Sequence, residues 1–334
     1  MSEARIWHGG DLDEARRRFP QAPEPWIDLS TGINPIAYPI PALPASSFER
    51  LPSPADRRDL EAAAAEAYGA ADAARVVAAP GTQILISLLP SLRPLSRVAV
   101  LGPTYAEHAQ AWRGAGHEVA EVTALDQARE ADILVLVNPN NPDGRMVERA
   151  ALREEAGRLR HRGGWLVVDE AFADFDAGET LVPELPDNAI VLRSFGKTYG
   201  LAGIRLGFAV ASAGMAARLR TMLGPWAVSG TAIAIGRQAL RDSEWRQVAG
   251  RARAQDAARL DRLLAPLADR PPVGTSLYRL MESRRAPELF AHLAHSGIWV
   301  RRFQHDPRLL RFGLPGSELA WKRLGQALDT FGGR

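Results

Sequence analysis

The sequence predicts an α/β protein with a large domain, built on a mainly parallel central sheet covered by helices, and a smaller α+β domain. Between residues 97 and 211, continuous apolar runs alternate with amphipathic stretches. Continuous apolar strands are typical of a sheet that is buried on both faces, and their alternation with helices favours parallel pairing. From about residue 213 long helical stretches come first and short strands follow, which indicates a second domain.

The composition is that of an ordinary globular protein with balanced charge. Hydrophobic residues make up 46% of the chain, and 41 basic residues nearly offset 39 acidic ones. No basic tract with interleaved aromatics is present, so nucleic acid is not expected as a partner. The absence of cysteine excludes disulfides, thiolate metal sites and a cysteine nucleophile. No apolar run approaches the roughly 20 residues of a membrane span, and the N-terminus lacks an apolar signal core, so we expect a cytoplasmic protein without a membrane partner.

The chain is predicted to begin with an N-terminal arm, residues 1–40, that contributes to the active site. Prolines crowd segment 35–56, which predicts an extended arm or surface loop because proline is excluded from the interiors of helices and sheets. The following stretch, residues 55–69, predicts a helix that ends at Gly69. This helix belongs to the predicted large domain, residues 41–212.

Apolar runs and amphipathic stretches predict the remaining elements of the large domain. The predicted strands cover 97–102, 117–122, 132–139, 165–170, 189–194 and 206–211, and the predicted helices cover 105–116 and 147–164. Glycines end both helices, as they often do.

The C-terminal part, residues 213–334, is predicted to be the small α+β domain. Its predicted helices cover 213–226, 231–245, 246–267 and 317–331, and its predicted strands cover 276–281, 298–302 and 309–314. Boundaries predicted from sequence carry an error of several residues.

Lys197 lies in a Gly-Lys-Thr sequence that ends like a nucleotide-binding P-loop. A P-loop requires a second glycine five residues before that motif, and this position is occupied by Val191. The sequence 189–193 instead predicts a buried strand that leads into the loop. A nucleotide site is therefore not expected, and Lys197 needs another role.

Three polar residues follow predicted strands at equal intervals: Asn141, Asp169 and Lys197. Singly, they could be a turn residue, a helix N-cap and a solvated lysine. Ligands of open α/β sheets, however, bind beyond the carboxyl ends of the strands. A partly desolvated lysine there can form a Schiff base with an aldehyde, and a neighbouring aspartate can keep a pyridine nitrogen protonated, which makes the ring an electron sink.

Further residues complete the same pocket. Ser194 and Arg205 flank Lys197 and can bind a phosphate group. A second anion site is expected where Gly81, Thr82 and Gln83 open a helix with free backbone amides. Tyr105 follows a strand and can stack on a ring, and the Asn141 amide can donate to the phenolate oxygen of that ring. These groups indicate a pyridoxal phosphate site.

The motifs that carry this inference also resemble a known family, the aminotransferase-like enzymes of fold type I. The resemblance covers nearly the whole chain and rests on PGTQ, PTYAEH, NPNNPDG, VVDEAFADF and SFGKTYGLAGIRLGF. It implies a Schiff base between the cofactor and Lys197, a pair between Asp169 and the pyridine nitrogen, and a contact of Asn141 with the ring oxygen. It also implies that the phosphate is bound by Gly81, Thr82, Gln83, Ser194 and Arg205, and that Tyr105 stacks on the ring.

The resemblance further implies where the substrate binds. Arg311, in RLLRFGLPG, occupies the position of the family's carboxylate-binding arginine; the alternative is a surface arginine on an edge strand. The N-terminal HGG and the S-x-x-INP sequence resemble the threonine-phosphate decarboxylase branch. By this resemblance His8 and Arg301 bind the substrate phosphate, although the neighbouring Arg302 could do so instead and His8 could merely be exposed. Gly32, Ile33 and Asn34 would line the carboxylate side.

Two departures from the aminotransferase pattern bear on the reaction. Phe172 occupies a position where transaminases of this group usually have a tyrosine that bonds the ring oxygen, and segment 49–56 lacks the tyrosine that often reaches the partner's cofactor. Loss of the hydroxyl at position 172 would change proton movement around Lys197, which weakens the transaminase interpretation and favours a decarboxylase. The expected reaction converts L-threonine O-3-phosphate into (R)-1-amino-2-propanol O-2-phosphate for cobalamin biosynthesis, with a homodimer as the expected assembly. The alternatives are a histidinol-phosphate-type aminotransferase and a non-enzymatic cofactor-binding protein.

Overall fold

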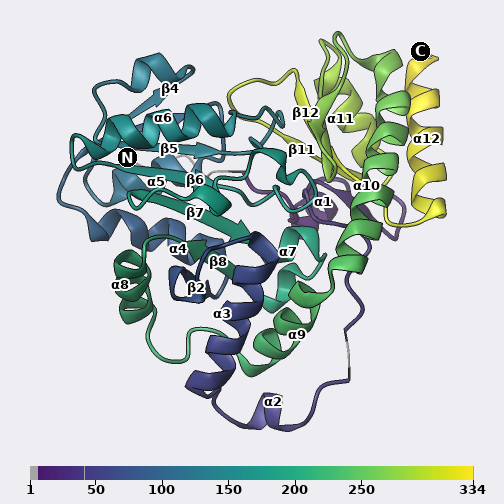
Figure 1. The fold of residues 1–334 in the computed structure, drawn as a ribbon. Coiled ribbons are helices and arrows are strands. Elements are labelled where there is room, and N and C mark those ends of the chain that lie inside the picture. The colour runs from purple at the N-terminus through teal and green to yellow at the C-terminus, as the bar shows by residue number, and fades with distance from the viewer. Residues whose placement is uncertain (1–6, 41, 334) are drawn as a thin grey trace. The chain divides into compact units, whose positions relative to one another are not determined.

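The computed structural model describes residues 7–40 and 42–333, and the chain divides into two compact units. Unit 1 comprises residues 1–36 and 248–334, and unit 2 comprises residues 37–247 (Figure 1). Residues 1–6 of the predicted N-terminal arm and residue 41 lie outside the described residues.

Unit 2 is built on a seven-stranded sheet with the strand order β2-β8-β7-β6-β5-β3-β4. The strands are β2 (Val76–Ala79), β3 (Arg97–Leu101), β4 (Glu118–Val122), β5 (Ile133–Val137), β6 (Trp165–Asp169), β7 (Ala189–Ser194) and β8 (Gly207–Val210). The five strands from β3 to β7 pair in parallel, whereas β8 is antiparallel to both β7 and β2. The predicted mainly parallel sheet is therefore confirmed.

Helices cover both faces of this sheet, because successive strand residues point to opposite sides. One core contains Leu134, Leu136, Leu166 and Val168, and the other contains Ile133, Val135 and Val167. The first core is completed by α3 (Pro54–Tyr68), α6 (Arg149–Arg160) and α9 (Gly230–Arg241), and the second by α4 (Thr82–Leu88), α5 (Glu107–Gly114) and α8 (Ala213–Leu223). Because both faces of these strands are buried, the strands appear in the sequence as continuous apolar runs.

The boundary between the units differs from the predicted boundary at residue 213. Helices α8 and α9 belong to unit 2, and α9 lies beside α3 (Figure 1). The reason is a close packing contact: a Cβ atom at Gly236 of α9 would lie 2.5 Å from a Leu206 methyl group and 3.1 Å from one of Leu60. Amphipathic helices carry no sequence signal for which sheet they cover, so the change of pattern at residue 213 did not mark the boundary.

Unit 1 has a five-stranded sheet with the order β1-β11-β12-β10-β9. Its strands are β1 (Ile27–Leu29), β9 (Val273–Thr275), β10 (Tyr278–Glu282), β11 (Ile298–Arg302) and β12 (Leu309–Gly313). Strand β1 pairs in parallel with β11, and the other neighbours are antiparallel. Part of the predicted arm is thus an edge strand of this sheet.

Helices complete the core of unit 1 with apolar side chains from both chain segments. Ala15 comes from α1 (Leu12–Arg18), and the remainder comes from α10 (Ser243–Leu264), α11 (Ala286–His295) and α12 (Glu318–Gly332). The short helix α2 (Ser46–Glu49) and α7 (Phe195–Thr198) belong to unit 2. Within the described residues, no helix combines the length and the apolar character that crossing a lipid bilayer demands.

Candidate active site

The structure brings the three predicted strand-end residues to the same edge of the unit 2 sheet. Asp169 is the last residue of β6, Lys197 lies in α7 directly after β7, and Asn141 follows β5. Strands β5, β6 and β7 are neighbours and run in parallel, so their carboxyl ends coincide. Phe172 lies in the turn that follows Asp169, and the centroid of its ring is 5.8 Å from the Lys197 ammonium nitrogen.

Asp169 is a buried carboxylate whose two oxygens are both held. The residue is 4% exposed, Oδ1 accepts a hydrogen bond from the Ala171 amide at 3.0 Å, and Oδ2 accepts one from His108 Nε2 at 2.9 Å. His108 lies on α5 and is itself 1% exposed. Sequence reasoning missed His108. His108 lies three residues after Tyr105, and its amide donates a hydrogen bond to the Tyr105 carbonyl, but this local turn does not indicate the contact with Asp169.

Tyr105 is positioned by the same group of side chains. Its ring contacts His108 edge to face with 6.1 Å between centroids, and its hydroxyl donates to Gln83 Oε1 at 3.1 Å. Gln83 in turn donates to Glu107 at 3.2 Å. Tyr105, which the sequence predicts to stack on a ring, is therefore connected to Asp169 through His108.

The predicted phosphate-binding residues also come together. Gly81 has φ of +85°, and a Cβ atom there would lie 2.6 Å from an Arg205 guanidinium nitrogen. A Cβ atom at Gly207 would lie 2.7 Å from the Thr82 amide nitrogen, and Gly207 pairs with Ser194 across β7 and β8. Arg205 therefore lies against the Gly81 loop, with Ser194 on the adjacent strand. Backbone amides, a hydroxyl and a guanidinium at one place fit a phosphate group.

Two other asparagines fix the loop that carries Asn141. Asn138 exchanges two hydrogen bonds with the backbone of Val147, at 3.1 and 2.8 Å. Asn140 donates to Asp143 at 2.7 Å and accepts a hydrogen bond from the Thr104 hydroxyl at 2.6 Å. These bonds use the side chains of Asn138 and Asn140, whereas Asn141 is the partly exposed one at the strand end.

These residues fit pyridoxal phosphate by their chemistry. An amine at Lys197 can bind the cofactor aldehyde, the buried Asp169 can pair with its ring nitrogen, and the Gly81 loop with Arg205 can hold its phosphate. All the residues predicted to bind the cofactor lie in unit 2.

The residues predicted to bind the substrate lie in unit 1, where Arg311 contacts the turn after β1. Arg311 is 7% exposed, donates to the Ser30 carbonyl at 3.0 Å and lies 5.0 Å from the centroid of the Tyr278 ring. Burial lowers the pKa of Arg311 from its usual range. A Cβ atom at Gly313 would lie 2.3 Å from the Thr31 carbonyl oxygen, so the turn and strand β12 are in direct contact. Arg311 is therefore not a surface arginine.

The N-terminal glycines pack on the same turn. A Cβ atom at Gly9 would lie 2.3 Å from the Ser30 carbonyl oxygen, and the Gly10 amide donates to the Ser30 hydroxyl at 2.7 Å. The Gly-Gly pair therefore allows the backbone of this segment to approach the turn closely. His8, next to Gly9, is exposed.

Gly32, Ile33 and Asn34 continue this turn, and Asn34 has a structural role in it. Asn34 is 2% exposed, and its Oδ1 accepts hydrogen bonds from Arg253 and from the Ile36 amide, both at 3.1 Å. Gly32 is buried and Ile33 is half-buried.

Arg301 and Arg302 point to opposite faces of the unit 1 sheet. Arg301 is directly opposite Arg311 in the β11–β12 register, so these two side chains share a face. The Arg302 guanidinium lies 4.1 Å from the centroid of the Phe290 ring and 4.6 Å from that of Trp7. Burial and the nearby Arg18 lower the pKa of Arg302. Of the two candidates, only Arg301 shares the face of Arg311.

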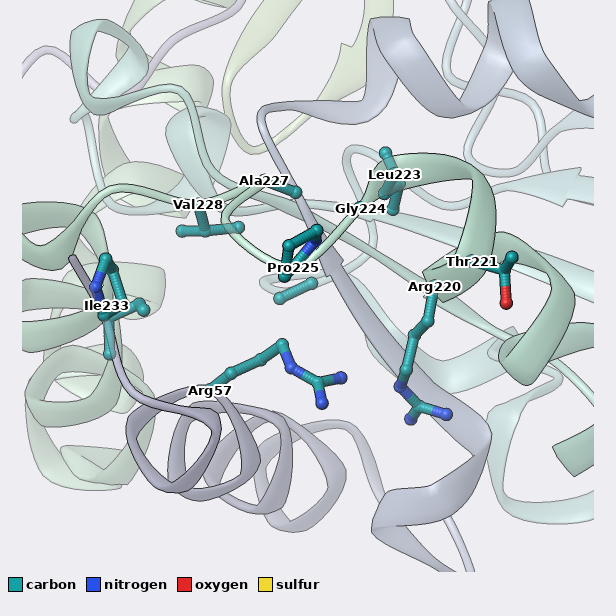
Figure 2. A pocket seen from close by; sticks show the side chains of 11 residues that line it. Arg57, Arg220, Thr221, Leu223, Gly224, Pro225, Ala227, Val228 and Ile233 are labelled. Carbon is teal, nitrogen blue, oxygen red and sulfur yellow. The ribbon is translucent and has the colours of Figure 1, made fainter.

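A cavity of about 290 Å³ lies elsewhere in unit 2 (Figure 2). Arg57 of α3 and Arg220 of α8 contribute to its wall, and none of the predicted cofactor residues does. Both arginines are paired with the buried Glu61, at 3.5 and 3.3 Å. Their position in the cavity wall is therefore explained by a structural ion pair.

Fold and site together define a class of protein. The sequence model of the family described as aminotransferase class I and II matches residues 24–321, and the chain belongs to this family of pyridoxal phosphate enzymes. More particularly, it is 43% identical over 328 residues to a threonine-phosphate decarboxylase from Pseudomonas aeruginosa, with 97% of each chain covered. It is 40% identical to a threonine-phosphate decarboxylase from Sinorhizobium sp, with 97% of this chain and 98% of the relative covered.

Solved structures confirm the fold at low sequence identity. A histidinol-phosphate aminotransferase from Sinorhizobium meliloti, in complex with pyridoxal-5'-phosphate, matches with a TM-score of 0.80 at 19% identity and covers 99% of this chain and 96% of its own. The L-threonine-O-3-phosphate decarboxylase from Porphyromonas gingivalis matches with a TM-score of 0.75 at 20% identity and covers 99% of both chains. The predicted fold type I is thereby confirmed.

Proposed function

We propose that this protein uses pyridoxal phosphate to decarboxylate L-threonine O-3-phosphate, giving CO₂ and (R)-1-amino-2-propanol O-2-phosphate, a step of cobalamin biosynthesis. The observation that carries this proposal is the 43% identity, over 97% of both chains, with a threonine-phosphate decarboxylase. The grouping of Asp169 and Lys197 at adjacent strand ends supplies the chemistry for it.

In this proposal the unit 2 residues bind and tune the cofactor. When bound, pyridoxal phosphate supplies an electron sink for the electron pair left on the substrate by departing CO₂. Lys197 holds the cofactor by its aldehyde, and Asp169, oriented by His108, keeps positive charge at the ring nitrogen. Gly81, Thr82, Gln83, Ser194 and Arg205 bind its phosphate, Tyr105 packs on its ring, and Asn141 donates to its ring oxygen. The substrate amine would replace Lys197 at the aldehyde, and the freed Lys197 amine would then return a proton to the α-carbon.

The unit 1 residues bind the substrate. Arg311 forms a two-pronged ion pair with the substrate carboxylate, and Gly32, Ile33 and Asn34 line that side. The Ser30 carbonyl fixes one edge of the Arg311 guanidinium, which sets the angle of the bond that breaks. His8 and Arg301 bind the substrate phosphate, and this choice of Arg301 over Arg302 follows from the face that it shares with Arg311.

Phe172 favours decarboxylation over transamination in this proposal. Its ring is buried, and it lies beside the Lys197 amine without a hydroxyl to offer. A hydroxyl at this position would donate to the cofactor ring oxygen and alter proton movement around Lys197. Because Phe172 has no hydroxyl, Lys197 is the group that carries the proton at this place in the site.

The test is to incubate the holoenzyme with L-threonine O-3-phosphate and measure CO₂ together with the organic products. We expect CO₂ and the amino-alcohol phosphate in equal amounts, with no accumulation of pyridoxamine phosphate. Histidinol phosphate with a keto acid as acceptor is the comparison substrate. A keto product formed in proportion to pyridoxamine phosphate would instead establish an aminotransferase.

We also propose that the enzyme is a cytoplasmic homodimer. Phe48, Leu51 and Trp226 of unit 2 are 71%, 67% and 58% exposed, and burying their apolar surface against a second copy would favour association. Sedimentation equilibrium tests the assembly, and a monomeric mass at micromolar concentration would contradict it. Fractionation of the producing cells tests the compartment.

A further inference from the structure

A group of buried charges lies behind the Asp169–Lys197 edge of the sheet. Asp169 is paired with Leu192 in the register of β6 and β7, and Glu170 and Arg193 are the next residues along each chain. Because successive residues of a strand point to opposite faces, Glu170 and Arg193 share the face that Asp169 does not use. The roles assigned above to the cofactor and substrate residues do not involve them.

Arg193 joins two carboxylates in this group. Its guanidinium donates to Glu170 at 2.6 Å and to Asp174 at 2.5 Å, and all three side chains are at most 4% exposed. Burial by itself lowers the pKa of Arg193, but Asp174 and Glu170 raise it above its usual range, so the guanidinium stays charged. Glu170 also accepts hydrogen bonds from the Thr180 hydroxyl at 2.6 Å and the Leu181 amide at 2.9 Å.

The Arg193 group lies close in sequence to both Asp169 and Lys197. The Glu170 amide donates a backbone hydrogen bond to the Leu192 carbonyl at 2.8 Å, and this bond joins the end of β6 to β7. Past this point the segment after β6 turns through Phe172 and Asp174. The segment after β7 enters α7, which carries Lys197. The forked guanidinium of Arg193 bonds two carboxylates. One belongs to Glu170, which follows Asp169 in sequence, and the other to Asp174, in the turn that carries Phe172.

We propose that Arg193 is a positioning residue that fixes the Phe172 turn and Asp169 relative to Lys197. Asp174 is two residues after Phe172, and the Phe172 ring lies beside the Lys197 amine. Loss of Arg193 would leave two buried carboxylates without their cation, which forces the turn to move or a carboxylate to take up a proton. Small displacements of this kind have large effects on rate because reacting groups must be aligned.

The inference is tested with three variants of the pyridoxal phosphate-loaded enzyme: Arg193→Met, Arg193→Lys and Asp174→Asn. The first readout is the pH at which the visible absorbance of the bound cofactor titrates. We expect Arg193→Met to shift this midpoint upward, since removing a nearby cation favours the protonated form, and Asp174→Asn to shift it downward. Arg193→Lys keeps the charge and is expected to restore the midpoint.

The second readout is the separation of kcat from KM, and it rests on the proposed function. For Arg193→Met we expect kcat to fall on the order of tenfold to a hundredfold with KM changed less than about threefold. Lysine cannot bond both carboxylates as a planar fork does, so Arg193→Lys is expected to recover only part of kcat.

Arg220→Met is the matched control, because it removes another arginine paired with a buried carboxylate, Glu61. We expect it to lower the thermal stability while leaving the absorbance midpoint and kcat unchanged. Midpoints for Arg193→Met and Asp174→Asn that equal the control's would overturn the proposal. If Arg193→Met does not fold, the Asp174→Asn shift decides. A wild-type enzyme that binds the cofactor but does not decarboxylate threonine phosphate would refute the proposed function and leave the absorbance test intact.

Discussion

At the scale of single residues, the site depends on buried groups whose partners lie far away in the sequence. Asp169 on β6 and His108 on α5 form one such pair, with both side chains almost fully enclosed. The sequence indicated Asp169 through its place at a strand end. It did not indicate His108, because nothing in a local pattern shows that a histidine on one helix will meet a carboxylate on a strand 61 residues later.

Replacing His108 by Phe should therefore slow catalysis without abolishing cofactor binding. Loss of the hydrogen bond lets Asp169 rotate or take up a proton, so we expect kcat to fall about tenfold, the effect of roughly 1.4 kcal/mol in the barrier. His117→Phe is the matched control, since His117 is also a buried histidine but bonds the Pro90 carbonyl. Steady-state kinetics corrected for the folded fraction provide the comparison, and equal losses in the two variants would contradict the role of His108.

Gly81→Ala tests the phosphate-binding loop. The backbone at Gly81 is in the left-handed region, and the added methyl group would displace the Arg205 guanidinium 2.6 Å away. We expect the affinity for pyridoxal phosphate to fall by at least about tenfold, measured by fluorescence titration of the apoenzyme. Gly69→Ala is the control, because Gly69 has φ of +74° but its Cβ would meet only Pro183 at 3.5 Å. It should lose stability by about 1 kcal/mol and keep cofactor affinity.

At the scale of elements, helix α3 shows how local sequence signals succeed. Ser53 and Asp56 form a reciprocal cap at its start, Pro54 occupies the first turn, and Gly69 ends it in the left-handed conformation. The predicted end at Gly69 is confirmed. Strands β1 and β2 were not predicted, because three or four residues give too short a pattern; β2 is recognisable only from its pairing with β8.

Ser53→Ala should destabilise unit 2 through the start of α3. We expect a loss of about 1 kcal/mol in the free energy of unfolding in urea at pH 7. Hydrogen bonds from Ser53 lower the pKa of Asp56, so the stabilisation by this carboxylate is present above its unfolded pKa of about 3.9 and is lost as the pH falls through the lower folded value. The difference between variant and wild type should shrink at pH 3, and a difference independent of pH would exclude the carboxylate from the cap.

At the scale of the whole molecule, the predicted roles divide between the units. The residues assigned to the cofactor all belong to unit 2, and those assigned to the substrate all belong to unit 1. Both the cofactor residues and the substrate residues could be predicted from the sequence, because each lies in a short local motif. It did not supply the division of the chain, since which core an amphipathic helix joins depends on long-range packing such as that of Gly236 on Leu60 and Leu206.

Variants in unit 1 should therefore change substrate binding without changing the cofactor. Arg311→Lys loses the planar fork, so we expect KM for threonine phosphate to rise by more than about tenfold. The cofactor absorbance and the affinity for pyridoxal phosphate should stay as in the wild type. Arg308→Lys is the control, since the exposed Arg308 pairs with Asp306 nearby in sequence. A change in the absorbance of Arg311→Lys, or no change in its KM, would show that Arg311 does not bind the carboxylate.

The parallel pairing of β1 with β11 has a consequence for the order in which the protein is made. Ile27 and Ile298 are neighbours in one sheet, so β1 leaves the ribosome long before its partner strand exists. Unit 2 is continuous in sequence and is complete at residue 247, so it can fold on the nascent chain before the second segment of unit 1 has been made. The apolar Trp26 and Leu29 therefore lack the strand they pack against until residues 298–300 have been made, near the end of the 334-residue chain.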